Sequence, residues 1–185
     1  MKKLMLSVLV LFAAITVSQA QDKYFTKTGK ITFYSSTPME DIEAQNKTTT
    51  SVIDTKTGKM EFAVLMKAFQ FEKALMEEHF NENYVESSKF PKANFSGTIT
   101  NLGDINFKKD GTYKAMVKGN LTIHGVTKPI EVPGTITVKD GAIQAVSTFN
   151  IAPEDYNIEI PSLVREKIAK QIKVTVDMAY EPFRS

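Results

Sequence analysis

The chain has 185 residues, with 23 Lys or Arg against 21 Asp or Glu, and it contains no cysteine. The lack of cysteine excludes disulfides, thiolate zinc sites, a cysteine nucleophile and a lipid-modified N-terminal cysteine. A domain of this length without disulfides must be stabilised by its hydrophobic core.

The first twenty residues have the three parts of a secretory signal. Lys2 and Lys3 precede a short apolar run, Leu4–Val17, and the small residues Ser18 and Ala20 favour cleavage after Ala20. The run is short for a membrane span, so a retained anchor helix is the less favoured alternative. We therefore expect a periplasmic or secreted protein.

The expected mature chain, residues 21–185, is long enough for one domain. Removing Lys2 and Lys3 lowers the basic residues from 23 to 21, which equals the number of acidic residues. A chain without net charge gives no electrostatic case for nucleic acid or an anionic membrane as its partner.

Seven segments then alternate apolar and polar residues with a period of two, as half-buried β-strands do. They are residues 31–35, 60–67, 93–100, 113–124, 130–138, 143–151 and 172–178. A polar stretch, Glu43–Ser51, is expected to be a further strand with a solvated face. Asp110-Gly111 and Asp140-Gly141 are strong hairpin signals, because both turn residues tolerate positive φ, and Thr57-Gly58 is a weaker one.

Two segments depart from this alternation and predict short helices. The first, Glu72–Phe80, places Leu75, Met76, His79 and Phe80 on one helical face. The second begins at Ser162, which can cap a helix whose Leu163, Val164 and Ile168 face inward.

The fold expected from these elements is all-β: an antiparallel barrel of eight or so strands, whose closure leaves no exposed edge. Such a barrel is either filled by side chains or holds one small ligand. Its predicted inner row combines large residues with small ones, namely Phe62, Phe95 and Tyr113 with Ala93, Gly97, Ala115, Gly119 and Gly134. Small inward residues favour a cavity, and the alternative is that they only fit the taper of the barrel.

Neither histidine has the neighbours that catalysis or metal binding requires. His79 and His124 could share a metal only with carboxylates, because there is no cysteine and no third histidine. His124 lies on the polar parity, with no acidic residue near it in sequence before Glu131. We expect it to be solvated, or at the end of the barrel with a hydrogen bond to the backbone. His79 is expected to pack over the mouth, the alternative being contact with a ligand's head group. No catalytic residue, metal or cofactor is predicted.

Three blocks resemble the YceI-like family of lipid- and polyisoprenoid-binding proteins. They are GNLTIHGVTKPIEV (119–132), HFNENYVESSKFPKANFSG (79–97) and TFNIAPEDYNIEIPS (148–162). The resemblance covers nearly all of residues 21–185. It implies an eight-stranded, lipocalin-like barrel, with one or two short helices over its mouth and an apolar tunnel for an isoprenoid or other lipid chain. The first block is then a hairpin that turns over Gly125–Pro129.

The predicted function is an exported protein, not an enzyme, that sequesters or transports a long-chain amphiphile. The predicted lining is Phe62, Val64, Met66, Phe95, Tyr113, Val117, Leu121 and Ile123, and the predicted lid is Leu75, Met76 and Phe80. Transient membrane contact and a homodimer are left open. Two alternatives remain: an enzyme that uses His79 or His124 on a lipid or an isoprenoid quinone, and a filled, non-binding stress-response barrel.

Overall fold

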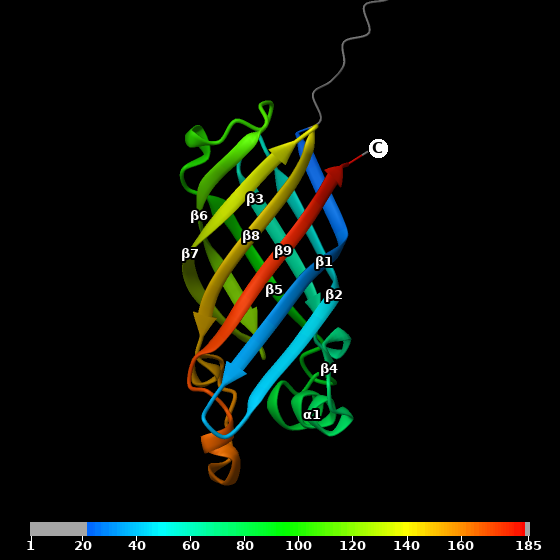
Figure 1. The fold of residues 1–185 in the computed structure, drawn as a ribbon, viewed down its shortest axis with the longest axis vertical. Coiled ribbons are helices and arrows are strands. Elements are labelled where there is room, and N and C mark those ends of the chain that lie inside the picture. The colour runs from blue at the N-terminus through cyan, green and yellow to red at the C-terminus, as the bar shows by residue number, and fades with distance from the viewer. Residues whose placement is uncertain (1–21, 184–185) are drawn as a thin grey trace, which may run out of the picture.

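The computed structural model describes residues 22–183, which form an elongated β-barrel with short helices at one end (Figure 1). The strands are β1 (Lys23–Ser36), β2 (Asp41–Asp54), β3 (Lys59–Leu65), β4 (Gln70–Phe71), β5 (Lys92–Ile99), β6 (Gly111–Ile123), β7 (Val126–Lys139), β8 (Ala142–Ile151) and β9 (Ile172–Pro182). The predicted signal peptide and its cleavage site lie outside the described residues.

Eight strands close the barrel. Their order is β1-β9-β8-β7-β6-β5-β3-β2, the additional β1–β2 pairing completes the ring, and every pair is antiparallel. The two-residue β4 pairs with Ala44 and Gln45 in the first half of β2. The all-β, eight-stranded antiparallel prediction is therefore confirmed, and the alternating residues of the predicted strands supply its inner face.

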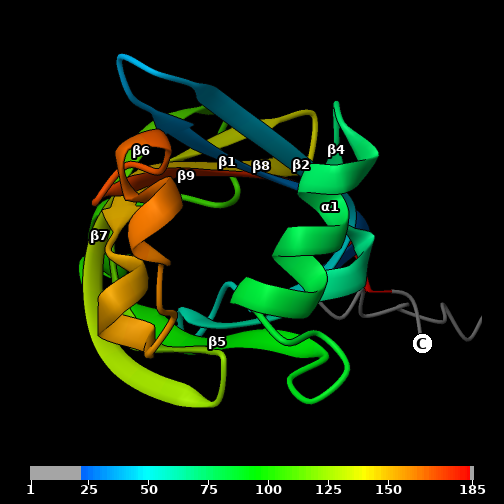
Figure 2. The ribbon, with the colours of Figure 1, turned by 90° about the horizontal axis from the view of Figure 1, so that it is seen from below.

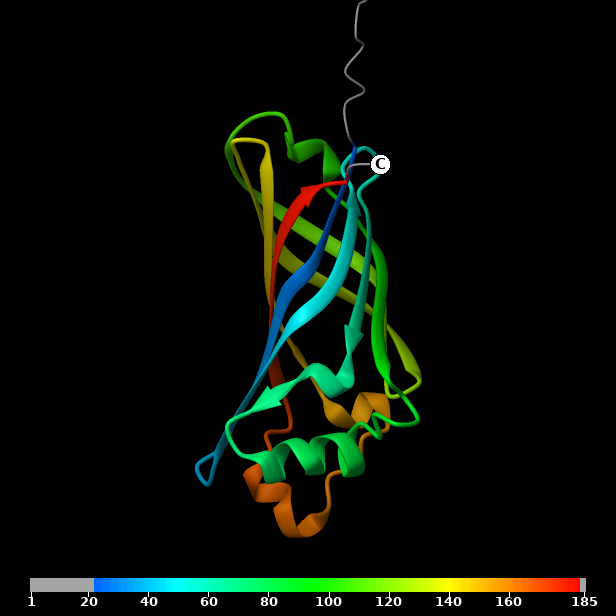
Figure 3. The same cartoon turned by 90° about the vertical axis from the view of Figure 1, so that its right-hand side faces the viewer.

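The helical segments are short, and most of them lie at one end of the barrel, which we call the mouth end (Figures 1 and 3). They are η1 (Met66–Ala68), α1 (Ala74–His79), the π-turn η2 (Phe80–Tyr84), η3 (Leu102–Asp104), η4 (Pro153–Tyr156) and η5 (Ser162–Lys167). Only η3 lies at the other end, which we call the closed end. Within residues 22–183, no helix is long and apolar enough to cross a membrane.

An aromatic cluster attaches α1 and η2 to the barrel. Phe33 of β1, Phe69, Phe71 of β4 and Phe80 of η2 have neighbouring ring centroids 5.1–5.6 Å apart. Tilted and edge-to-face aromatic pairs of this spacing add stability beyond the buried area. The cluster holds the predicted lid helix beside the mouth (Figure 2).

Two predicted turns differ in the structure. Asp110-Gly111 is not a two-residue hairpin, because the β5–β6 connection is a longer loop containing η3, and Asp110 instead accepts a hydrogen bond from the Asp140 N–H at 3.1 Å. The β6–β7 turn is not Gly125–Pro129 but His124-Gly125, with φ of 51° and 74°. Asp140-Gly141 has positive φ at both residues, as predicted.

The predicted strand over Glu43–Ser51 is part of β2, but its polarity has a second cause besides solvation. Asn46, Thr49 and Ser51 are buried inside the barrel. The Asn46 amide donates to the Leu65 carbonyl at 2.9 Å, where β3 ends, and Ser51 Oγ donates to the Glu61 carbonyl at 2.9 Å. Asn46 and Ser51 thereby pair with backbone carbonyls of β3, which matters because a buried polar side chain is costly to leave unpaired.

Candidate functional site

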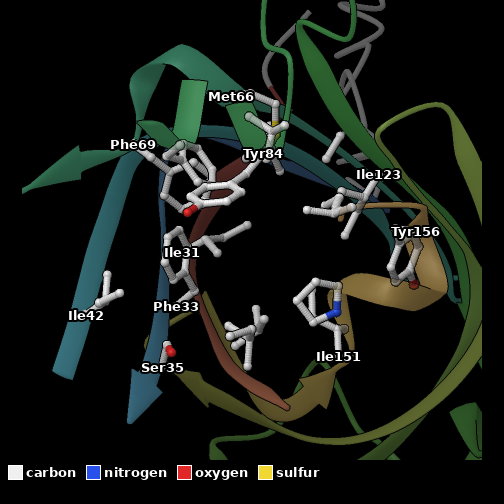
Figure 4. Close-up of a pocket in the computed structure, with 18 of the residues that line it drawn as sticks. Ile31, Phe33, Ser35, Ile42, Met66, Phe69, Tyr84, Ile123, Ile151 and Tyr156 are labelled. Atoms are coloured by element: carbon white, nitrogen blue, oxygen red, sulfur yellow. The ribbon is translucent and has the colours of Figure 1, made fainter. Parts of the chain in front are cut away.

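The mouth half of the barrel is hollow. A cavity of about 580 Å³ opens between the helical segments, and inward side chains from all eight barrel strands line it. On β6 the lining runs from Val117 to Ile123, about 20 Å of strand at roughly 3.4 Å per residue. Figure 4 looks into this opening, with Ile31, Phe33, Met66, Ile123 and Ile151 around its wall. The volume falls in the range of pockets for drug-sized ligands, about 300–1,000 Å³.

The predicted lining and lid residues, with one exception, contribute to this cavity. Those that line it are Phe62, Val64, Met66, Leu75, Met76, Phe80, Phe95, Val117, Leu121 and Ile123. Tyr113 does not line it, because it lies at the start of β6 near the closed end, where its hydroxyl donates to the Lys109 carbonyl at 2.9 Å. Tyr113 is on the inward face of β6, as predicted. The alternation of the strand does not show where along the barrel axis an inward residue lies, so its distance from the cavity was not predicted.

Gly97 of β5 and Gly119 of β6 do not widen the cavity. A Cβ on Gly97 would lie 2.4 Å from Phe95 Cζ, and one on Gly119 would lie 2.6 Å from the same atom. The Phe95 ring therefore folds over both glycines and closes the space that they leave. At these two positions the small residues do not provide cavity space, contrary to the prediction, because the Phe95 ring fills it.

The second predicted helix exists as the 3-10 turn η5, but only part of its apolar face is turned inward. Val164 and Ile168 line the cavity as predicted. Leu163 points outward and is 94% exposed, contrary to the prediction. A 3-10 helix has three residues per turn instead of 3.6, so the α-helical spacing used for the prediction assigns the wrong face.

Charged lining groups lie at the mouth, and the deeper wall is apolar or neutral. Glu40 and Lys73 form an ion pair at 3.4 Å that joins the β1–β2 turn to the start of α1, and Lys167 lies on η5. Burial raises the pKa of Tyr84, and burial together with the nearby Asp155 raises that of Tyr156. Both phenols therefore stay neutral at physiological pH, so the cavity wall suits an apolar chain with its polar end at the mouth.

His124 connects three segments of the mouth end. Its Nε2 lies 2.7 Å from Glu86 Oε2, its Nδ1 lies 3.1 Å from the Tyr156 carbonyl, and its ring packs edge-on against Phe90 with centroids 4.5 Å apart. Both ring nitrogens therefore face oxygen atoms, one of the Glu86 carboxylate and one of the Tyr156 carbonyl. Glu86 and His124 each have positive φ, 44° and 51°, a conformation that is uncommon outside glycine. We call this contact the His124–Glu86 latch.

The predicted placement of His124 at a barrel end, bonded to backbone, is confirmed, but its side chain is only 11% exposed and is not solvated. The carboxylate partner was missed because Glu86 is 38 residues away in sequence. His79 is exposed and lines the cavity at the mouth.

The enzyme alternative requires a histidine that lines the cavity and also has a carboxylate partner. Among residues 22–183, neither histidine meets both conditions. His124 has a carboxylate partner but does not line the cavity, whereas His79 lines the cavity but has no carboxylate hydrogen bond. In the same range, no group of three or more His, Asp or Glu residues is placed to hold a metal ion.

The YceI-like domain model matches residues 15–180 of this chain. The chain belongs to the YceI-like family. No curated protein matches it. Solved structures at low identity share the fold: a polyisoprenoid-binding domain from Saccharophagus degradans implicated in plant cell wall breakdown has a TM-score of 0.77 at 15% identity, covering 89% of this chain and all of that one.

Two further YceI-type structures agree on the architecture. Burkholderia cenocepacia BcnA has a TM-score of 0.68 at 15% identity, covering 83% of this chain and 96% of that one. The Campylobacter jejuni YCEI protein has a TM-score of 0.54 at 15% identity, with full coverage of both chains. These similarities confirm the predicted barrel, in agreement with the family assignment.

The structure adds lining residues that were not included in the predicted site. They are chiefly Phe33, Phe69, Phe71, Ile130, Val132, Phe149, Ile151, Tyr156, Ile158, Val174 and Val176. Those on β7, β8 and β9 carry the same inward alternation as the predicted ones, so the pattern could have found them. Tyr156 and Ile158 lie in an irregular connection that carries no periodic pattern.

Proposed function

We propose that this protein is an exported carrier that holds the apolar chain of an isoprenoid-like lipid in the mouth half of its barrel. The observation that carries this proposal is the cavity of about 580 Å³, with an apolar wall and its charged groups gathered at the opening. An amphiphile would enter tail first, and its head group would stay at the mouth among Lys73, Glu40, His79 and Lys167.

The isoprenoid character of the cargo rests on family membership and on the description of the Saccharophagus degradans neighbour as a polyisoprenoid-binding domain. The lining also suits a branched, flexible chain. Phe62, Met66 and Phe149 combine wide aromatic faces with an adaptable thioether, which can repack around methyl branches. A filled, non-binding barrel is disfavoured because the interior contains this void.

Affinity would come from apolar area removed from water, at about 25 cal/mol per Å², or about 0.8 kcal/mol per buried methylene. Ordering the flexible chain opposes this gain, at about 0.5–1.5 kcal/mol for each immobilised flexible group by analogy with side chains. Affinity should therefore depend on chain length more than on the head group.

Lipid extraction and mass spectrometry of the purified protein test this function. We expect the wild-type protein to yield a long-chain lipid and Val132→Phe, which places a ring in the cavity, to yield much less. Val146→Phe on β8 is the matched control, because Val146 lies on the outer surface and is 36% exposed. Equal lipid content in Val132→Phe and wild type, or none in wild type, would refute the proposal.

Export and a non-enzymatic role complete the proposal. The N-terminal sequence predicts that the mature protein begins at Gln21, and N-terminal sequencing of protein from the periplasmic fraction checks this. Turnover chemistry is not required for binding, so replacing His79 and His124 together should leave the extracted lipid chemically unchanged.

A further inference from the structure

The turn η5 is an apolar projection at the mouth end. Val164 and Ile168 of this segment face the cavity, whereas Leu163 is 94% exposed. In Figures 1 and 3 this turn, coloured orange, extends further along the barrel axis than the other mouth segments. An exposed leucine alone needs no explanation, but one on the turn that extends furthest beyond the cavity's opening is placed to touch whatever the opening faces.

The chain that follows Leu163 is basic, whereas the stretch before it carries Glu154, Asp155 and Glu159. From Ser162 to Lys173 there are four basic residues, Arg165, Lys167, Lys170 and Lys173, against the single acid Glu166. All four are exposed, and within the described part of the chain none of them forms an ion pair. Lys173 lies over the Tyr34 ring, with its Nζ 5.2 Å from the ring centroid.

The opposite side of the mouth has the opposite charge. From Glu72 to Glu86, which includes α1 and η2, there are five acidic residues and one lysine. The small net charge of the whole chain, from which no anionic partner was expected, averages over these two sides. An anionic surface would therefore attract residues 165–173 and repel the α1 side, which sets a tilt.

We propose that the η5 segment docks on the surface of an anionic phospholipid bilayer, with Leu163 inserted at the boundary between head groups and acyl chains. Arg165, Lys167 and Lys170 then lie at head-group depth, where each basic residue strengthens binding about fivefold. β1 begins and β9 ends at the closed end, so neither obstructs this contact (Figure 1). The proposal rests on the proposed function only in taking the cargo to be a membrane lipid.

Vesicle flotation tests the docking surface. The mature protein is mixed with vesicles of phosphatidylethanolamine and phosphatidylglycerol, or of phosphatidylcholine alone. We expect flotation with the anionic vesicles and about tenfold weaker binding for Leu163→Asp. Lys170→Glu changes two units of charge and should weaken binding about 25-fold. Neither residue lines the cavity, and the exposure of Leu163 means that its replacement removes almost no packing.

Leu65→Asp is the matched control, because Leu65 is an exposed leucine of β3 that lies outside the cavity and away from η5. It should float like wild type. Equal flotation of wild type and Leu163→Asp, equal loss in Leu65→Asp, or equal binding to phosphatidylcholine vesicles would overturn the proposal.

Uptake of cis-parinaric acid, a fluorescent long-chain probe, separates this proposal from the carrier function. Leu163→Asp should take up the probe from vesicle-free solution as wild type does. Loss of flotation with retained uptake supports docking through η5, and loss of both in Leu163→Asp counts against it. If wild type floats but takes up no probe, the docking surface stands and the carrier function fails.

Discussion

The two halves of the barrel have the same strands and the same inward alternation, yet one is packed and the other is hollow. In the closed half, Ile53, Ile136, Ile143, Met178 and Tyr180 are each at most 2% exposed. In the mouth half, inward residues of the same strands line the cavity instead. The alternation of apolar and polar residues therefore determines which face of each strand points into the barrel. Whether the interior is packed depends on how far the side chains extend across the barrel axis and on the segments that cover each end.

The largest expected effect compares one isoleucine from each half. Ile136→Ala removes a side chain that is 2% exposed, and it should lower the free energy of unfolding by about 2–5 kcal/mol. Ile151→Ala, in the cavity wall, should cost less than half as much, because Ile151 already borders a void. Urea unfolding of both lipid-free variants measures this. Equal losses would show that the two halves are packed alike.

The packing of Phe95 over the glycines of β5 and β6 can be disturbed at Gly119. A Cβ there would lie 2.5 Å from both Gly97 Cα and the Ser96 carbonyl oxygen, so Gly119→Ala must move backbone and should cost about 1–3 kcal/mol. Gly103→Ala is the control, because nothing lies within 4 Å of its Cβ position. Thermal unfolding should show a lower Tm for Gly119→Ala alone. An unchanged Tm would mean that Phe95 does not pack tightly over Gly97 and Gly119.

Tyr180 makes the closed half sensitive to alkaline pH. Burial raises the pKa of Tyr180 above its usual value near 10, and its 2.7 Å hydrogen bond with Ser51 opposes this only in part. The pKa of Tyr180 is higher in the folded protein than in the unfolded chain, so the neutral phenol contributes its full stabilisation below about pH 10. As pH rises from there towards the folded-state pKa, the free energy of unfolding should fall by up to about 1.4 kcal/mol per pH unit.

Tyr180→Phe checks this assignment. At neutral pH the free energy of unfolding of the variant should be about 1 kcal/mol lower, because the hydrogen bond between Tyr180 and Ser51 is lost. Ser51 keeps its hydrogen bond to the Glu61 carbonyl. Above pH 10 the variant's free energy of unfolding should fall less steeply than that of wild type. Urea unfolding at a series of pH values measures this. If the free energies of unfolding of the two proteins fall in parallel above pH 10, the loss of stability at alkaline pH belongs to other groups.

The smallest expected effect concerns the His124–Glu86 latch in the mouth half. Glu86→Gln weakens the contact at 2.7 Å and should destabilise the 80–90 segment by about 0.5–1 kcal/mol, seen as two- to fivefold faster amide hydrogen exchange. Lys89→Gln is its control, because the Lys89–Glu86 pair is exposed and 3.8 Å long. Unchanged exchange in Glu86→Gln would show that the latch does not hold the mouth segments.

Sequence patterns predicted the features that depend on neighbours along the chain. Period-two rows gave the strands and the inward faces, because side chains alternate across a strand. Position along the barrel axis was not predictable in this way, so Tyr113 was assigned to the cavity although it lies near the closed end. Contacts between distant segments were also missed, since Glu86 meets His124 only after the barrel closes.

The buried polar residues of β2 show the same limit. Asn46 and Ser51 belong to a stretch that looks solvated, yet both are at most 1% exposed. Their partners are the carbonyls of Leu65 and Glu61 on β3, which are known only once the strand pairing is known. The short η5 turn was misjudged for a local reason, because its 3-10 geometry turns Leu163 outward.

The most direct test of the hollow mouth half is the affinity of the lipid-free protein for geraniol, farnesol and geranylgeraniol, measured by competition against cis-parinaric acid. These prenols share a head group and differ in tail length. The cavity predicts tighter binding with each added isoprene unit until the tail reaches the deep end of the cavity near Val117 and Val132, and a weakened series in Val132→Phe. An affinity that does not change with tail length, or that Val132→Phe leaves intact, would contradict the account.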